Sequence, residues 1–414
     1  MKIKYNTILD LLFVLYVFST IVISKSIMAK IIQIVFVIFI FLLVRIKNIK
    51  FTKYNFFDVM FMCFIFCQII FGIAVLKDSA FNVGVTVFYN VIFSFAILNY
   101  FIYRKDMKKI SRLYAITTVI SLFILALLYY DSILSLRFTT NEVIKLFGVK
   151  LFGGHSSTAL SMIALIPCFF LNLFYDEKHK KSNIIISIIL FTFSILTGTR
   201  KTIIVFAFIF LFMMTLKGKN INFSRIIKIL GVSIIAFSIS FLMIFKISFL
   251  YDVIGYRVQN AIVYFNSDEK KTNDSSIIVR NRLIKKAMDL YEDKKMLGWG
   301  MNYFQASGQN ESNLYTHNNF LEILTGGGII GFFIYYIKYI IMFIAIVLAY
   351  IKNNNKYVWF CSLIFFSLMI FLEYWQVTYI YRYILIYQVF IVYLLYKNKN
   401  NRKQDSHEKE KTIS

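Results

Sequence analysis

A histidine beside a short amide cluster is the first candidate for chemistry in this chain. His317 lies in Thr316-His317-Asn318-Asn319, after the longest hydrophilic segment and directly before an apolar run. An imidazole has an ordinary pKa of about 6.5, so it can accept the proton of an attacking hydroxyl. The alternative is a solvated loop histidine beside a helix start, where Asn319 caps the helix and Glu322 completes a capping box.

Three arginines supply a second chemical ingredient. Arg200 stands in a polar break between two apolar runs, and the break is so short that the side chain must lie at or just beneath the outer interface. An unpaired cation is costly there, so a partner is expected. Arg280 and Arg282 belong to the long hydrophilic segment, and guanidinium forks suit phosphate oxygens. In the alternative interpretation, the Arg200 side chain extends to lipid phosphates, and Arg280 only makes one face of a helix hydrophilic.

The elements that must position these residues are membrane helices. Hydrophobic residues make up 59% of the 414 positions, the mean hydropathy is +0.69, and apolar runs recur near the length needed to cross a bilayer. We therefore expect an all-α, polytopic membrane protein with about twelve transmembrane helices. The runs lie at about 7–24, 31–44, 56–76, 80–103, 113–130, 156–175, 183–198, 202–216, 229–250, 328–351, 357–373 and 377–396. The first run is expected to be retained rather than cleaved as a signal peptide.

The distribution of lysine and arginine predicts the orientation. With the N-terminus inside, most basic residues fall on cytoplasmic loops, as the positive-inside rule requires. We therefore expect a multi-pass protein of the inner or plasma membrane with both termini in the cytoplasm. This topology and attraction to anionic lipids account for much of the net charge of +25, so no nucleic-acid partner is expected.

This topology divides the chain into four parts. Residues 1–250 hold membrane helices 1–9, and residues 251–319 form one large extracytoplasmic loop between the ninth and tenth helices. Within that loop, the spacing after Ser275-Ser276 predicts an amphipathic helix. A lid that moves on Gly298 and Gly300 is a further hypothesis. Residues 320–396 hold membrane helices 10–12, and residues 397–414 are predicted to be a disordered cytoplasmic tail.

The remaining candidate ligands have simpler interpretations. His155 is the other histidine on the outer face, but it follows two glycines and precedes Ser156, which is more typical of a loop and a helix cap than of a base. Cys63 and Cys67 share a helix face, yet two thiols without further ligands make a poor metal site. No metal or cofactor is expected.

Three segments together carry a family resemblance. They are Thr197-Gly198-Thr199-Arg200 before an apolar run, Arg280-Asn281-Arg282 leading to Leu297-Gly298-Trp299-Gly300, and His317-Asn318 through Gly328 and Gly331. In this order they resemble the O-antigen ligase and polymerase superfamily over roughly residues 150–350. The resemblance implies a metal-independent, inverting glycosyltransferase on the extracytoplasmic face. Its donor would be an oligosaccharide linked to polyprenyl pyrophosphate, such as undecaprenyl pyrophosphate.

The resemblance also implies roles for residues. Arg200 and Arg280, with Arg282 beside it, would bind the pyrophosphate. His317 would deprotonate the acceptor hydroxyl, and Asn318 and Glu322 would support it. A repeat-unit polymerase for O-antigen lipopolysaccharide or capsule is favoured over a ligase that transfers the glycan to a lipid core or protein. Membrane lipids, a flippase and a chain-length regulator are expected partners.

A different class of function stays open. A flippase would bind the same lipid-linked sugar without cleaving it. Ionisable residues within or near apolar runs often mark a substrate path, and here they are Lys246, Lys338, Glu373 and Arg382. The two lysines could instead pair with acidic groups or snorkel.

Overall fold

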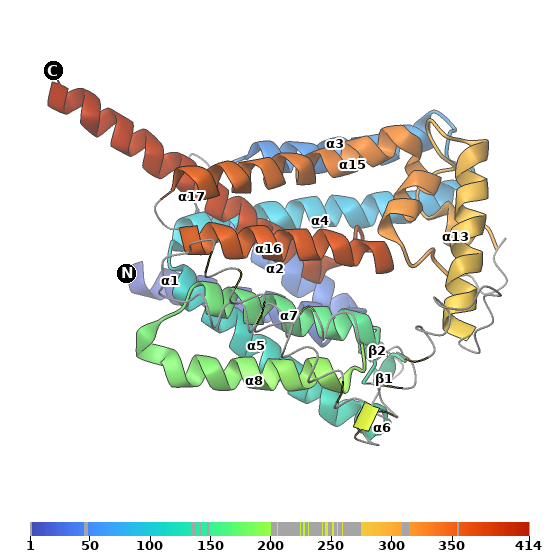
Figure 1. Cartoon of the computed structure of the whole chain (residues 1–414), viewed down its shortest axis with the longest axis horizontal. Coiled ribbons are helices and arrows are strands. Elements are labelled where there is room, and N and C mark those ends of the chain that lie inside the picture. Colours follow the sequence, from blue (N-terminus) through green and yellow to red (C-terminus); the bar gives the residue numbers. More distant parts are fainter. Residues whose placement is uncertain are drawn as a thin grey trace. The chain divides into compact units, whose positions relative to one another are not determined.

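The chain has long apolar runs and a single proline. Such runs fold into helices, because a helix pairs its internal backbone N–H and C=O groups with one another. The computed structural model describes residues 2–44, 49–134, 138–140, 142–146, 149–199, 275–308, 314–353 and 356–413, with isolated positions between 205 and 259. The chain forms two compact units, Met1–Phe36 with Asp106–Val279 and Val37–Lys105 with Arg280–Ser414. Figure 1 shows the helices of each unit.

The first unit is built around α5. It contains α1 (Lys2–Ile21), the start of α2 (Ile27–Leu43), α5 (Met107–Leu128), α6 (Tyr130–Leu134), α7 (Ser157–Leu173), a 3-10 turn (Glu177–His179) and α8 (Lys180–Leu196). α5 packs against α1, α7 and α8, and α7 packs against α8. A small antiparallel hairpin joins β1 (Ile144–Leu146) to β2 (Val149–Phe152), with Leu146 opposite Val149. The all-α prediction missed this hairpin, whose alternating pattern is only a few residues long.

The second unit holds the candidate site. It contains α3 (Lys53–Ile70), α4 (Lys77–Arg104), α13 (Ser275–Asp293, from Arg280 onward), α14 (Tyr303–Ala306), α15 (Asn319–Lys352), α16 (Lys356–Leu372), a 3-10 turn, η4 (Glu373–Trp375), and α17 (Arg382–Ile413). α15 packs against α3, α16 and α17, and α4 packs against α3 and α17. The predicted amphipathic helix after Ser275 is confirmed as α13, which buries Leu283, Ala287 and Leu290.

The predicted disordered tail is helical as far as the structure describes it. α17 continues from the apolar run to Ile413, and the segment 397–414 contains neither glycine nor proline. Lysine, glutamate and glutamine are good helix formers, so an existing helix can continue through them.

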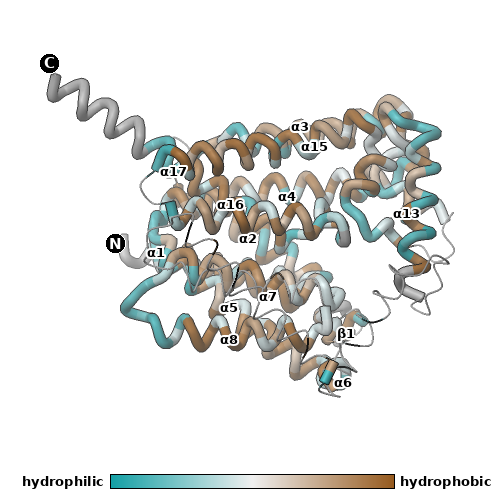
Figure 2. Tube along the Cα trace, in the orientation of Figure 1, coloured by the Kyte–Doolittle hydropathy of each residue, from teal (hydrophilic) through white to brown (hydrophobic). Residues whose placement is uncertain are grey.

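Nine of the described helices are apolar enough to be candidate membrane helices. Figure 2 shows the hydrophobic residues in brown. Five have the length and hydropathy to cross it: α3, α4, α5, the turn with α8 (Glu177–Leu196), and α15. Four shorter apolar helices are Tyr5–Ile21, Ile27–Leu43, Ser157–Leu173 and Lys356–Leu372. The protein is therefore a helical membrane protein. The count of twelve spans and the loop between the ninth and tenth stay predictions, because most of residues 200–274 lie outside the described part.

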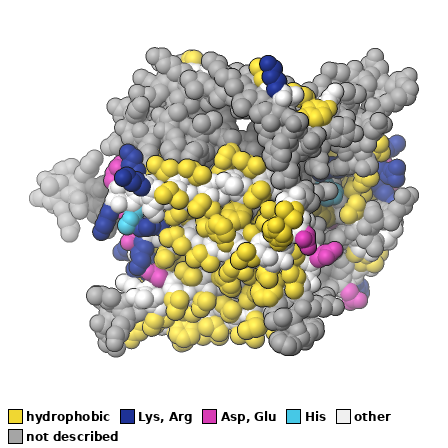
Figure 3. Space-filling model, turned by 90° about the horizontal axis from the view of Figure 1, so that it is seen from below, with side chains coloured by type: hydrophobic (Ala, Val, Ile, Leu, Met, Phe, Trp, Pro, Cys, Tyr) yellow, Lys and Arg dark blue, Asp and Glu magenta, His cyan; other side chains and the backbone are white. Residues whose placement is uncertain are grey.

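Exposed apolar side chains support this assignment. On α5 and α8 they include Ile120, Phe123, Leu127, Ile185 and Ile188. Figure 3 shows hydrophobic side chains gathered over much of the face seen from below, with lysine and arginine at its margins. Such a continuous apolar surface is suited to lipid chains rather than to water.

Candidate functional site

α15 turns back on itself at Gly328. This residue has φ 60° and ψ −168°, a conformation open essentially to glycine alone. Asn319 Nδ2 donates to the Tyr336 hydroxyl at 2.9 Å, and the Phe320 and Tyr336 rings stack with centroids 4.8 Å apart. In a straight helix residues 319 and 336 would be about 25 Å apart. α15 thus consists of a first arm, residues 319–327, folded back along a second arm, residues 329–352.

The segment after α13 is hydrogen-bonded to this turn. Gly300 N–H donates to Gly326 O at 2.9 Å, and Gln68 Nε2 donates to the same carbonyl at 2.9 Å. A Cβ on Gly298 would lie 2.5 Å from the Gly326 carbonyl, and one on Gly300 would lie 2.7 Å from Ala74 Cβ. The two glycines predicted as lid hinges therefore serve close backbone packing.

The fold-back decides where His317 lies. Asn319 is beside Tyr336, which is about 12 Å along the second arm from Gly328. His317 directly precedes the first arm, so it lies at the end of that arm that is remote from the turn. The apolar run predicted at 328–351 corresponds to the second arm. The placement of His317 at the membrane surface stays a prediction.

A local hydrogen-bond network holds the backbone around His317. Its φ is 56°, which is uncommon for a residue with a side chain. Thr316 N–H donates to Glu322 Oε2 at 3.1 Å, and Thr316 Oγ1 donates to Asn318 O at 2.7 Å. Glu322 is only 1% exposed. These bonds fix the residues on both sides of the histidine.

The helix cap differs from the predicted one. Asn318, not Asn319, is the N-cap, and its Oδ1 accepts from Phe320 N–H at 2.9 Å and Leu321 N–H at 3.2 Å. With the cap at 318, Glu322 is one position too late for a capping box. Its carboxylate reaches the backbone before the cap instead.

A tyrosine connects the histidine to one of the arginines. The Tyr315 and His317 ring centroids are 4.3 Å apart. Burial raises the pKa of Tyr315, while the nearby Arg280 guanidinium lowers this pKa and the Glu322 carboxylate raises it. Tyr315 thus contacts His317 and is within electrostatic range of the Arg280 guanidinium. That the two residues act in one site stays a prediction.

Arg280 and Arg282 are both exposed on α13, and residues two apart on a helix face different directions. Arg280 is the one whose charge acts on Tyr315. The role of Arg282 stays a prediction. Arg200 lies outside the described residues, so its role stays a prediction.

A buried carboxylate anchors the start of the first arm. Glu373 is 1% exposed. Its Oε2 accepts from Asn319 Nδ2 at 3.1 Å and from the Tyr336 hydroxyl at 2.9 Å, and its Oε1 accepts from Thr378 Oγ1 at 2.9 Å. Asn319 Oδ1 in turn accepts from Thr378 N–H at 2.8 Å. The network joins α15 to the η4–α17 connection and supports the backbone beside His317.

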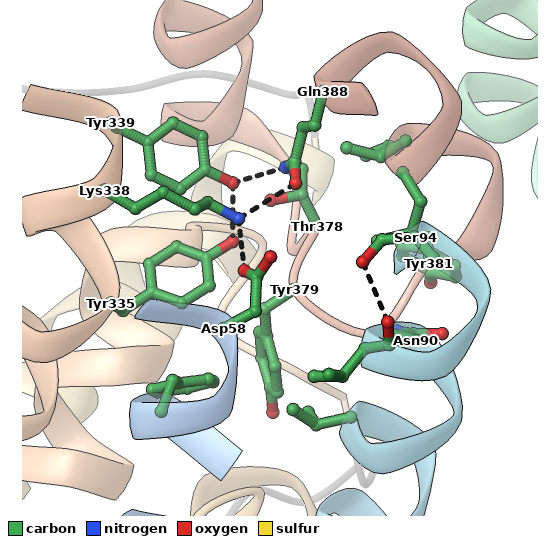
Figure 4. A pocket seen from close by; sticks show the side chains of 15 residues that line it. Asp58, Asn90, Ser94, Tyr335, Lys338, Tyr339, Thr378, Tyr379, Tyr381 and Gln388 are labelled. Carbon is green, nitrogen blue, oxygen red and sulfur yellow. Dashed lines mark hydrogen bonds and ion pairs between the residues drawn. The ribbon is translucent and has the colours of Figure 1, made fainter. Parts of the chain in front are cut away.

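Next to this network lies a small polar cavity (Figure 4) of about 40 Å³. Lys338 Nζ donates to Asp58 Oδ1 at 2.5 Å and to Gln388 Oε1 at 3.1 Å. Gln388 Nε2 donates to the Tyr339 hydroxyl at 2.6 Å, which is 3.0 Å from the Tyr335 hydroxyl. The prediction that Lys338 pairs with an acidic group is confirmed. An isolated Asp58 in an apolar run was the sequence signal for its partner.

His155, in the first unit, has a structural role. It is 7% exposed, and its Nε2 lies 2.9 Å from Ile21 O. Burial lowers the pKa of His155 to about 4, with a backbone hydrogen bond to Ile21 opposing and Lys25 adding to the shift. Ser156 caps α7 by accepting from Ala159 N–H. The prediction of a loop and helix cap is confirmed.

Several of these residues escaped the sequence analysis. Tyr315 and Tyr336 are two among 28 tyrosines, and Asn319 was read only as a cap. Glu373 was recognised as an ionisable residue near an apolar run, but its partners lie 37 and 54 positions away. No local sequence pattern indicates contacts between residues so far apart in the chain.

Comparison with known proteins identifies the part of the chain that contains this site. Residues 185–336 match the O-antigen ligase family model, and no curated protein matches the chain. The matched range includes Arg200, Arg280, Arg282 and His317. This part of the chain is therefore similar to the O-antigen ligase family.

Proposed function

We propose that this protein polymerises oligosaccharide repeat units linked to polyprenyl pyrophosphate into a surface polysaccharide, on the extracytoplasmic side of the membrane. The observation that carries the proposal is the position of Tyr315, which neighbours both the candidate base His317 and the candidate phosphate ligand Arg280. An imidazole and a guanidinium at one place are the two groups needed to transfer a sugar from a pyrophosphate.

The reaction is a single displacement. The acceptor hydroxyl attacks the anomeric carbon of the donor while His317 takes the hydroxyl proton. The bond between that carbon and the pyrophosphate oxygen breaks, and polyprenyl pyrophosphate leaves with the bonding electron pair. Arg280 stabilises the negative charge on the leaving group, and Arg200 and Arg282 are the further candidates for this role. Attack opposite the leaving group inverts the configuration, and no metal is required.

The surroundings of His317 suit this chemistry. Water competes with the acceptor sugar for the anomeric carbon, and hydrolysis would waste the activated donor. His317 is half-buried and so is less open to bulk water than a fully exposed loop histidine. The Thr316, Asn318 and Glu322 contacts fix the backbone on both sides of it.

The choice of polymerase over ligase concerns the acceptor. A polymerase transfers the growing chain to another lipid-linked repeat, whereas a ligase transfers it to a lipid core or a protein. We favour the polymerase by analogy with the diverse, aromatic-rich chains of that group. The product would be O-antigen or capsule, with a flippase supplying substrate and a chain-length regulator limiting the polymer.

A deletion strain tests the proposal. Single repeat units on the cell surface after deletion are the expected result. A surface without repeats would indicate a missing ligase or flippase instead. Purified protein should also convert the lipid-linked repeat into longer glycans with release of polyprenyl pyrophosphate, and unchanged sugar linkages would point to a flippase.

A further inference from the structure

The cavity beside the candidate site contains an unsatisfied amide. Asn90 of α4 is 4% exposed, and in the described part of the chain neither its Nδ2 nor its Oδ1 has a hydrogen-bond partner. Both atoms belong to a residue that lines the cavity. A buried amide without partners is rare in folded proteins because its desolvation is uncompensated. The amide is therefore suited to a ligand or to water.

The chemistry of the amide restricts the ligand. Nδ2 needs an acceptor and Oδ1 needs a donor. A hydroxyl supplies both, whereas an ionised phosphate lacks a donor and a hydrocarbon chain lacks both. The Asp58 carboxylate, whose Oδ1 binds Lys338, has further capacity to accept. Because Lys338 and Asp58 compensate each other, the cavity has no excess positive charge for a pyrophosphate.

Two residues that line the cavity connect it to the candidate site. Tyr381 lines it and is half-buried, and its hydroxyl lies close enough to Tyr315 for the two to interact electrostatically. Thr378 lines it as well and donates to Glu373 beside the first arm. An aromatic ring at the edge and hydroxyl-binding groups within are the usual means of holding a sugar.

The size of the cavity sets how much of a sugar can enter. A volume of about 40 Å³ holds roughly three water molecules. That is room for one polar substituent, such as a hydroxyl or hydroxymethyl group, but not for a whole ring. The ring itself would remain at the edge, against Tyr381.

We propose that this cavity is a specificity pocket for the acceptor sugar. One hydroxyl-bearing substituent of the sugar enters the cavity and forms hydrogen bonds with Asn90 and Asp58. It thereby aligns the sugar ring so that the reactive hydroxyl of the acceptor meets His317. The assignment to the acceptor rests on the proposed function, in which Arg280 binds the pyrophosphate end of the donor. The pocket thus selects which sugar is extended.

The test uses a probe without lipid or pyrophosphate. Mild acid releases the repeat-unit oligosaccharide from its lipid carrier, and its affinity for the detergent-solubilised full-length protein is measured by saturation-transfer NMR. Asn90→Leu removes both hydrogen-bonding groups at similar size. Asn82→Leu is the matched control, since Asn82 lies on the same helix and is exposed.

The expected result is equal binding by the wild type and Asn82→Leu and about tenfold weaker binding by Asn90→Leu, the change that one or two neutral hydrogen bonds produce. Asn90→Ser, which replaces the amide by a hydroxyl that can both donate and accept, should recover part of the affinity. It also serves as the test variant if Asn90→Leu does not fold. Wild-type affinity in both Asn90 variants would overturn the pocket. So would a wild type that polymerises lipid-linked repeats without binding the free oligosaccharide. Asn90-dependent binding without any polymer would instead refute the proposed function alone.

Discussion

The rings of Tyr315 and His317 lie with their centroids 4.3 Å apart at an angle of 46°. The same phenol interacts electrostatically with Arg280 and Glu322. Tyr315 is thus the residue through which the candidate base, the candidate phosphate ligand and the carboxylate that fixes the Thr316 backbone are connected.

Tyr315→Ala should therefore impair catalysis more than Tyr315→Phe. The phenylalanine keeps the ring against His317, while alanine removes the ring contact with the imidazole. Misplacing a catalytic group by about 1 Å can cost about a hundredfold in rate. We expect polymer formation by purified protein to fall at least tenfold in Tyr315→Ala and to stay within about threefold of the wild type in Tyr315→Phe. Equal activity in the two variants would contradict a positioning role for the ring.

Arg280 and Arg282 should respond differently to substitution by lysine. Lysine keeps the charge but loses the planar fork. Because the charge of Arg280 acts on Tyr315, Arg280→Lys should lower the polymerisation rate at least tenfold, and Arg282→Lys should change it little. Rates are compared at equal protein abundance with the lipid-linked repeat as substrate. A larger effect at Arg282 would assign the pyrophosphate to that residue instead.

Gly328→Ala should unfold the turn of α15. A Cβ at Gly328 would lie 2.3 Å from Met296 O, and its φ and ψ suit glycine alone. We expect a loss of about 3 kcal/mol or more in the free energy of unfolding, seen as a lower thermal midpoint in detergent. Gly72→Ala is the control, because Gly72 also has a positive φ of 68° but nothing within 4 Å of an added Cβ. It should cost only about 1–2 kcal/mol. Equal costs would show that the close packing against residue 296 is unimportant.

His155 should make stability depend on pH. Its folded pKa of about 4 lies below the ordinary value of about 6.5, so the unfolded state binds the proton more readily. Stability from this residue is complete above pH 6.5, falls between pH 6.5 and 4, and is constant below. The full loss is about 3 kcal/mol. Thermal midpoints measured across this range should fall for the wild type and fall less for His155→Gln. Parallel curves would refute the burial of a neutral imidazole.

Chelation tests the metal-free mechanism. Because guanidinium groups are proposed to stabilise the leaving pyrophosphate, EDTA should leave the rate of polymer formation by purified protein unchanged. Loss of activity that a divalent ion restores would require a metal in the site.

The sequence predicts the helices of this protein well but not the shape of its site. The runs at 56–76, 80–103 and 113–130 correspond to α3, α4 and α5, since apolar length alone decides a membrane helix. The turn at Gly328 escapes the same reasoning. The sequence places the apolar run at 328–351, so it does not predict a helical arm at residues 319–327 that folds back along this run. The contacts that stabilise the turn come from Gln68 and Gly300, far away in the chain.

The sequence predicts only part of the chemistry of the site, because contacts between distant segments decide the rest. His317 and Arg280 could be proposed from residue type and order, but their shared neighbour Tyr315 could not, because it depends on how α13 packs against α15. Asn319 and Glu373 form a pair 54 positions apart. Asn90 has no local signal at all, since only the cavity reveals that its amide lacks a partner.

The most direct measurement of the central claim is the polymer made by His317→Ala protein. A base in the displacement step contributes about a hundredfold or more to the rate. At normal protein abundance, we expect cells that carry this variant to display single repeats in place of the chain-length ladder, and purified variant protein to make no detectable polymer. A ladder identical to that of the wild type would show that His317 is not the base.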